Sequence, residues 1–208
     1  MTAVKPIKNS WETGESVRAP LLSKVIADMD PDRRLFIIDL GGLRSGTLHR
    51  LAEFRCRLDV LDFDVQGPKP KDDADPLDEL RTRLNQRLPD ARGETADLLL
   101  CWNYLNYFST TQIELLMASL LPRLSERAAI HALIESSAPD MPGTPAPMAI
   151  ADHDHLLTWS DPSEDAASVR VPAPRHSSDG LTACMPGVVA DQTMLLGTGQ
   201  KEYLFRRR

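Results

Sequence analysis

Aromatic residues are scarce in this chain, at 5% of its 208 residues. So few rings provide no large stacking surface for unpaired bases, and the core must consist mainly of aliphatic side chains. Basic residues are not in excess either, because the net charge is −6. A mildly acidic protein gains nothing from the phosphate backbone of DNA or RNA, so we expect no nucleic-acid partner.

Cysteine is equally scarce. Cys56, Cys101 and Cys184 are odd in number and widely spaced, and no C-x-x-C pair occurs. This pattern argues against a disulfide framework and against a zinc site, and it is typical of proteins in a reducing compartment. The sequence therefore predicts a cytoplasmic protein.

Long apolar runs are absent as well. No stretch of about 18 apolar residues occurs, so we expect neither a transmembrane helix nor a membrane partner. Residues 1–15 are polar and lack the apolar segment of a secretory signal, which predicts a loose N-terminal lead-in. The length fits a single domain over residues 1–208, which is large enough to bury a substantial core.

The strongest pattern in the chain is a strand followed by glycines, a helix and a second strand. Leu35–Ile38 is a continuous apolar run of the kind that is buried on both faces of a sheet. Apolar residues then recur at helical spacing over residues 47–54, and Leu58–Phe63 is a second strand candidate. This order within about thirty residues is a βαβ unit, which predicts a parallel sheet.

The rest of the chain continues the alternation of helices and strands. Patterns of the same kind predict helices over residues 15–29, 77–88, 111–121 and 177–185, strands over 97–102 and 128–134, and an antiparallel hairpin formed by 188–196 and 201–205. No strand is evident between residues 64 and 97. Residues 137–175 are rich in proline and predict an insertion or loop region, in which 148–159 has the pattern of short strands.

The residues of the glycine turn after the first strand are typical of a nucleotide-binding site. Asp39 closes the strand, and Gly41 and Gly42 allow a ligand to approach the backbone closely. Asp62 ends the second strand about twenty residues later, where doubly wound folds hold a ribose hydroxyl. The alternative is an ordinary strand-to-helix turn, whose glycines serve packing and whose acidic end is solvated.

These segments together resemble the class I S-adenosylmethionine-dependent methyltransferases. The resemblance rests on the run Leu35–Gly42, the second strand Leu58–Asp62, the strand Ala96–Asn103, the helix end at 120–124 and the hairpin 186–205. It implies an α/β fold with a Rossmann-like methyltransferase sheet, mostly parallel, with a C-terminal antiparallel hairpin and a short or missing third strand. It also implies S-adenosylmethionine as the cofactor, bound by Asp39, Gly41, Gly42, Asp62, Trp102 and Asn103.

On the acceptor side of such a site, the resemblance would place Tyr104, Asn106 and Tyr107, which follow the fourth strand. For these three residues, ordinary packing where a strand meets a helix is an equal alternative. No catalytic base stands out, and the methyl acceptor, whether a small molecule or a protein side chain, stays open.

The chain also departs from the family pattern. Leu43 and Arg44 interrupt the usual D-x-G-x-G-x-G spacing, and Asn103 stands where many members carry an acid. Two functional hypotheses follow: methyl transfer to an unidentified acceptor, or a catalytically inactive protein on the same fold that acts as a binding or regulatory partner. In the second case the hairpin and the proline-rich segment are candidate surfaces for a protein partner. A different nucleotide-binding α/β enzyme is a third alternative, against which the hairpin argues.

A metal site is not expected. The segment Asp152–His155 alternates carboxylates and imidazoles, but a metal needs three or four converging ligands and the sequence supplies no further ones nearby. A solvated hairpin tip explains this segment better.

Overall fold

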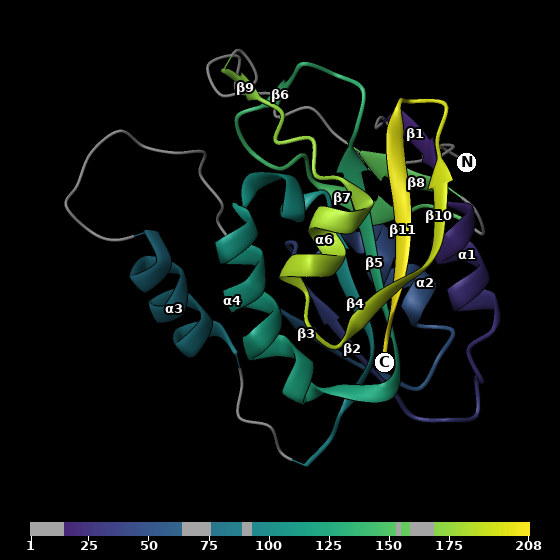
Figure 1. Cartoon of the computed structure of the whole chain (residues 1–208). Coiled ribbons are helices and arrows are strands. Elements are labelled where there is room, and N and C mark those ends of the chain that lie inside the picture. Colours follow the sequence, from purple (N-terminus) through teal and green to yellow (C-terminus); the bar gives the residue numbers. More distant parts are fainter. Residues whose placement is uncertain (1–14, 64–75, 89–92, 153–154, 159–168) are drawn as a thin grey trace, which may run out of the picture.

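A six-stranded sheet forms the centre of the molecule (Figure 1), in the order β10-β11-β5-β4-β2-β3. The computed structural model describes residues 15–63, 76–88, 93–152, 155–158 and 169–208. Strands β2 to β5 run parallel, and β11 pairs antiparallel with both β5 and β10. The strands are β2 (Leu35–Asp39), β3 (Cys56–Val60), β4 (Ala96–Trp102), β5 (Leu124–Glu135), β10 (Val188–Leu195) and β11 (Gln200–Arg207). The predicted parallel sheet with a C-terminal hairpin is confirmed.

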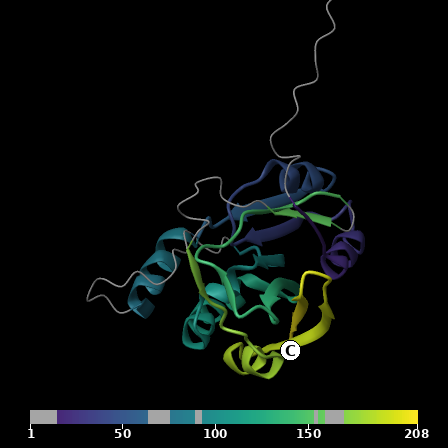
Figure 2. The same cartoon turned by 90° about the horizontal axis from the view of Figure 1, so that it is seen from above.

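Helices cover both faces of this sheet, as the view from above shows (Figure 2). One face carries α1 (Pro20–Ala27) and α2 (Ser45–Leu51), and the other carries α3 (Pro76–Arg87), α4 (Thr110–Leu120) and α6 (Ser178–Cys184). Two short 3-10 turns, η2 (Tyr104–Tyr107) and η3 (Leu121–Arg123), flank α4. No helix in these ranges is both long and apolar enough to cross a membrane.

Each face of the sheet has its own hydrophobic core. Phe36 and Ile38 of β2 pack toward α3, α4 and α6, while Ile37 of the same strand packs toward α1 and α2. All five residues of β2 are buried. A strand enclosed on both sides needs apolar residues at every position, which is why the run was continuous rather than alternating.

The predicted helix over residues 15–29 is wrong in its first turn. Helix α1 begins at Pro20, and Glu15–Arg18 forms strand β1, which pairs antiparallel with β8 (His155–Thr158). Ala19 has an extended backbone with φ −137°, because the proline ring that follows it disfavours helical geometry. Proline is well tolerated at the first helical position, so Pro20 begins the helix and does not lie within it.

The segment 137–175 contains short strands in addition to loops. β6 (Asp140–Pro142) pairs with β9 (Arg170–Pro172), and β7 (Met148–Ile150) pairs with β8. Strands β1, β8 and β7 thus form a second, three-stranded sheet, which contacts α2 through β7. Between β3 and β4, the described part of the chain holds α3 and no further strand of the central sheet.

Candidate functional site

The chain reverses its direction of travel across the sheet between β2 and β4. From β2 it passes through α2 to β3 on one side, and then through α3 to β4 on the other side. In open α/β sheets the crevice beyond the carboxyl ends of the strands at such a switch point is the usual ligand site. Asp39 ends β2 and Trp102 ends β4, so both residues lie at this point.

Asp39 and Trp102 are directly bonded. The indole Nε1 of Trp102 donates to Oδ1 of Asp39 over 2.5 Å, and the backbone N–H of Gly41 donates to the same oxygen over 2.7 Å. Both side chains are about 2% exposed. At the switch point, Oδ1 of the buried Asp39 carboxylate therefore already accepts two hydrogen bonds from the protein itself.

The carboxyl group of Asp39 is electrostatically unusual. Burial raises its pKa from an ordinary value of 3.8 to about 6, since a charged carboxylate loses its hydration there. The hydrogen bonds from Trp102 and Gly41 oppose this rise, and the nearby charge of Asp62 adds to it. Strongly shifted carboxyl groups in a crevice are typical of functional sites, although structural networks also produce them.

The two glycines of the turn make room for neighbouring side chains. A Cβ on Gly41 would lie 3.0 Å from Cδ1 of Trp102, and a Cβ on Gly42 would lie 3.0 Å from Oδ1 of Asp62. Gly41 is buried, whereas Gly42 is partly exposed. Both positions therefore need a residue without a side chain. At Gly41, however, the group that lies against the backbone is the indole of Trp102 and not a ligand.

Asp62 has a different environment from Asp39. It is exposed, with a left-handed backbone at φ 44°, and its N–H donates to the carbonyl of Gly41 over 3.2 Å. This bond fastens the end of β3 to the glycine turn, so the Asp62 carboxylate lies beside Gly42 and is open to solvent. The geometry thus brings the predicted residues Asp39, Gly41, Gly42 and Asp62 together, with Asp62 as the accessible one.

Trp102 also has a strained backbone, at φ 49°. This left-handed conformation costs a bulky residue on the order of 1–3 kcal/mol and persists only where its surroundings enforce it. The pairing of β4 with β5 shifts register between Leu100 and Trp102, and the indole meets the His131 ring edge-on at 6.3 Å between ring centroids. The surrounding structure thus fixes the indole over Gly41.

Asn103 and Asn106 follow Trp102 but differ in how their amides are used. Asn106 is fully bonded: Nδ2 donates to the carbonyls of Asn103 and Leu133, and Oδ1 accepts from the N–H of Glu135. Asn103 is 6% exposed, and its Oδ1 has no hydrogen-bond partner in the described part of the chain. An unpaired buried amide oxygen is costly, so Asn103 has capacity for a ligand that Asn106 lacks.

The two tyrosines of η2 have different contacts. The hydroxyl of Tyr107 donates to the carbonyl of Thr144 over 2.8 Å, and burial raises the pKa of this phenol well above its usual range. Tyr104 packs against the hydrophobic cores on both faces of the sheet. Tyr107 therefore connects η2 to the segment that follows β5.

The glycine turn continues into a helix start that β7 covers. A Cβ on Gly46 would lie only 2.7 Å from the carbonyl oxygen of Ile150, and Thr47 Oγ1 accepts from the N–H of Ile150 over 3.2 Å. Arg44 precedes the helix and is exposed, with Nη2 3.9 Å from a Cβ on Gly42. The cover over α2 could not be predicted because no local pattern links it to residues 148–150.

A second feature that the sequence did not reveal is a buried acid beneath the site. Glu202 on β11 and His131 on β5 are fully buried, with 3.1 Å between Oε1 and Nε2. The Glu202 carboxylate also accepts from the N–H groups of Leu21 and Leu22 in the first turn of α1, over 3.0 and 2.9 Å. The only signal was an acidic residue at the start of an apolar run.

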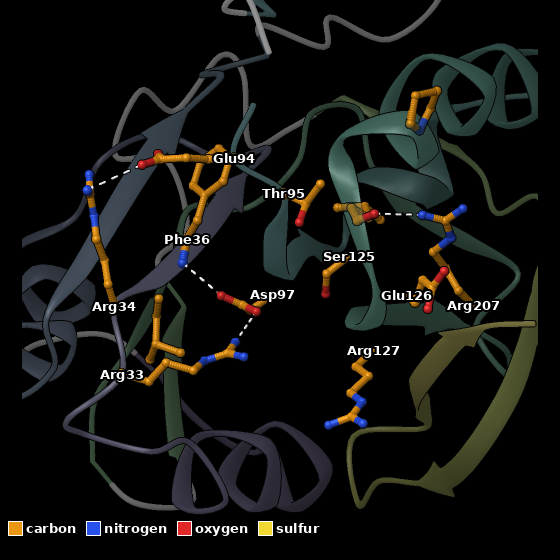
Figure 3. Close-up of a pocket in the computed structure, with 13 residues that line it drawn as sticks. Arg33, Arg34, Phe36, Glu94, Thr95, Asp97, Ser125, Glu126, Arg127 and Arg207 are labelled. Carbon is orange, nitrogen blue, oxygen red and sulfur yellow. Dashed lines mark hydrogen bonds and ion pairs between the residues drawn. The ribbon is translucent and has the colours of Figure 1, made fainter. Parts of the chain in front are cut away.

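A surface groove of about 700 Å³ lies at the opposite, amino-terminal edge of the sheet (Figure 3). Its charged side chains largely serve the fold: Arg33 pairs with Asp97, which also accepts from the N–H of Phe36, and Arg34 pairs with Glu94. Arg207 donates to the carbonyls of Leu121, at the start of η3, and of Leu124, which follows it. The groove lies at the end of the sheet away from the switch point, so the carboxyl edge stays the better candidate.

No metal centre is evident in the ranges that the structure describes, because no three His, Cys, Asp or Glu side chains converge there. In the segment Asp152–His155, Oδ1 of Asp152 lies 3.0 Å from Nδ1 of His155 and accepts from the backbone N–H of His155 over 3.0 Å. His153 and Asp154 lie outside the described residues.

Comparison with known proteins identifies the fold. No protein-family model matches the sequence, and no curated protein matches it either. Among solved structures, the chain is similar to the 1,6-didemethyltoxoflavin-N1-methyltransferase of Burkholderia thailandensis, with a TM-score of 0.50 and 13% identity, over 97% of this chain and 81% of that one. It is equally similar to a protein of Pyrococcus horikoshii OT3, with a TM-score of 0.50 and 12% identity, over 91% and 88%.

The mitomycin 7-O-methyltransferase MmcR also matches, with a TM-score of 0.49 and 14% identity over 89% of this chain, which spans only 52% of that protein. A putative O-methyltransferase from Nostoc punctiforme is likewise matched over 55% of its length. The chain thus spans about half of these two proteins. At such low identity the likeness concerns the fold alone, and this chain has the mostly parallel sheet with an antiparallel hairpin of the Rossmann-like methyltransferases.

Proposed function

We propose that this chain binds S-adenosylmethionine at the carboxyl edge of β2 and β3 and transfers its methyl group to an acceptor. The observation that carries the proposal is the convergence of Asp39, Gly41 and Asp62 at the switch point of the sheet. The ligand itself would supply an electrophilic methyl group, so the protein needs to position reactants and needs no nucleophile of its own.

The nucleoside half of this ligand fits the residues present. The Asp62 carboxylate is exposed beside the partly exposed Gly42, and a carboxylate there suits the two hydroxyl groups of a ribose. The amino-acid half does not fit in the same way, because Trp102 covers Gly41 and takes an oxygen of Asp39. We therefore derive no catalytic step from that half of the site.

The acceptor would lie on the side of η2 and the 137–175 segment. Tyr104 and Tyr107 are half-buried there, and Asn103 has an unpaired amide oxygen. Asn106 supports this arrangement from behind, since its amide holds η2 against the end of β5.

The second candidate function is a catalytically inactive protein on the same fold that acts as a binding or regulatory partner. The contact between Trp102 and Gly41 favours it, and so does Leu43, which is 54% exposed where the methyltransferase pattern has glycine. The two candidates differ in whether the carboxyl edge accepts an adenosyl ligand at all.

Calorimetric titration with S-adenosylhomocysteine separates the two candidates. We expect binding by the wild-type chain and binding at least about tenfold weaker for Asp62→Ala, because hydrogen bonds to a charged group contribute about 1.5–3 kcal/mol. Asp28→Ala is the matched control, since it removes an exposed carboxylate at the end of α1, and its affinity should equal that of the wild type. The absence of binding at millimolar ligand would refute the methyltransferase proposal and leave the fold unaffected.

A further inference from the structure

The indole of Trp102 has the hydrogen-bonding role that a ligand amine would have at this site. Its Nε1–H donates to Oδ1 of Asp39, and its Cδ1 and Nε1 lie 3.0 and 3.1 Å from the position of a Cβ on Gly41. An ammonium group that approached Asp39 across Gly41 would meet the same oxygen and the same face of the glycine. Indole and ammonium therefore compete for one position.

The competing indole is built into the protein. Trp102 is 2% exposed, its backbone is left-handed, and its ring stands edge-on to His131. His131 in turn bonds to Glu202, which holds the first turn of α1. Displacement of the indole would disturb this buried set of contacts as well as the bond to Asp39.

Among the residues that the structure describes, no side chain occupies the other half of the site in this way. Asp62 is exposed and Gly42 is partly exposed. A ligand can therefore reach the carboxylate of Asp62 while Trp102 stays in place. The structure thus divides the carboxyl edge into an accessible nucleoside half and a half that the protein fills itself.

We infer that Trp102 is an internal occupant of the amino-acid half of the site, so that the resting chain recognises the adenosyl part of its ligand and excludes the amino-acid part. This inference rests on the proposed function for the nucleoside half. Specificity is a difference of affinities, and it arises here because an amino-acid tail must displace a bonded, buried indole. The affinity constant that such a tail would confer is multiplied by the small fraction of molecules in which the indole has moved away.

The test compares two ligands that differ only at the amino-acid end, by calorimetry on the full chain. S-adenosylhomocysteine carries the ammonium and carboxylate groups, and 5′-methylthioadenosine carries neither. For the wild type we expect dissociation constants within about threefold of each other, since the tail finds its place occupied. For Trp102→Ala we expect S-adenosylhomocysteine to bind at least about tenfold more tightly than to the wild type, with 5′-methylthioadenosine unchanged.

Two further variants keep the test independent of any damage to the fold. Trp102→Phe retains a ring over Gly41 but loses the N–H donor, so it should shift the ligand preference in the same direction by a smaller factor. Tyr203→Phe is the matched control, because it removes an aromatic hydrogen bond, to Ser178 Oγ over 2.7 Å, away from the site. Its ligand preference should equal that of the wild type.

The remaining outcomes overturn the inference in distinguishable ways. If the wild type already prefers S-adenosylhomocysteine by tenfold and Trp102→Ala loses that preference, Trp102 is part of the wall that binds the amino-acid end. The proposed function would then stand and the inference would fall. If neither ligand binds to any folded variant, the proposed function fails and the inference falls with it.

Discussion

The buried carboxyl group of Asp39 should contribute stability to the folded protein at acidic pH that is lost at neutral pH. Its pKa of about 6, against an ordinary 3.8, means that the folded state holds this proton to a higher pH than the unfolded state. At about 1.4 kcal/mol for each pKa unit, the difference corresponds to about 3 kcal/mol. This contribution is present below pH 4 and is lost as the pH rises through about 6.

The substitution Asp39→Asn isolates this effect, because the amide keeps an oxygen that accepts from Trp102 and Gly41 and carries no charge. Urea unfolding, followed by circular dichroism from pH 4 to pH 8, gives the free energy of unfolding of both proteins. We expect the variant and the wild type to be equal near pH 4 and the variant to be about 2–3 kcal/mol more stable above pH 7. Asp28→Asn should show no such divergence. A variant that is less stable than the wild type at pH 7.5 would refute the reasoning.

Two further substitutions test contacts that hold the site in place. Glu202→Gln should lower the free energy of unfolding by about 1–3 kcal/mol, because each carboxylate oxygen accepts one N–H group from α1 and the amide NH2 would leave one of these buried donors unpaired; an unchanged free energy of unfolding in urea would contradict this. Gly46→Ala should cost about 1–3 kcal/mol despite the higher helix propensity of alanine, because the new Cβ would lie 2.7 Å from the Ile150 carbonyl oxygen. Gly197→Ala, which meets nothing within 4 Å, is its thermal-unfolding control, and equal melting temperatures for the two variants would argue against the clash.

The central sheet was predictable because its signals are local. The continuous apolar run of β2 and the glycines that follow it lie within eight residues, and Asp62 follows at the end of the next strand. The hairpin of β10 and β11 was predictable for the same reason, since two apolar runs flank a short glycine-containing connection. The sequence therefore supported the parallel sheet with its C-terminal hairpin, and it placed Asp39 and Asp62 after neighbouring strands.

The interior of the candidate site was not predictable, because it depends on pairings between distant residues. Nothing local indicates that Trp102 turns back to bond Asp39, since the apolar pattern of β4 gives no sign of where its backbone becomes left-handed. Strand β1 was interpreted as part of a helix because its partner, β8, lies about 140 residues further along the chain. Apolar spacing over so few residues does not distinguish a strand from a first helical turn.

The contact between Glu202 and α1 has a consequence for the order of folding events. The two N–H groups of Leu21 and Leu22 find their acceptor 181 and 180 residues later in the sequence. During synthesis α1 therefore emerges long before the acceptor of these two N–H groups, which bond to water until β11 has paired with β5. Because such long-range closure is slow, α1 is among the last elements to be completed although it precedes the central sheet in the sequence.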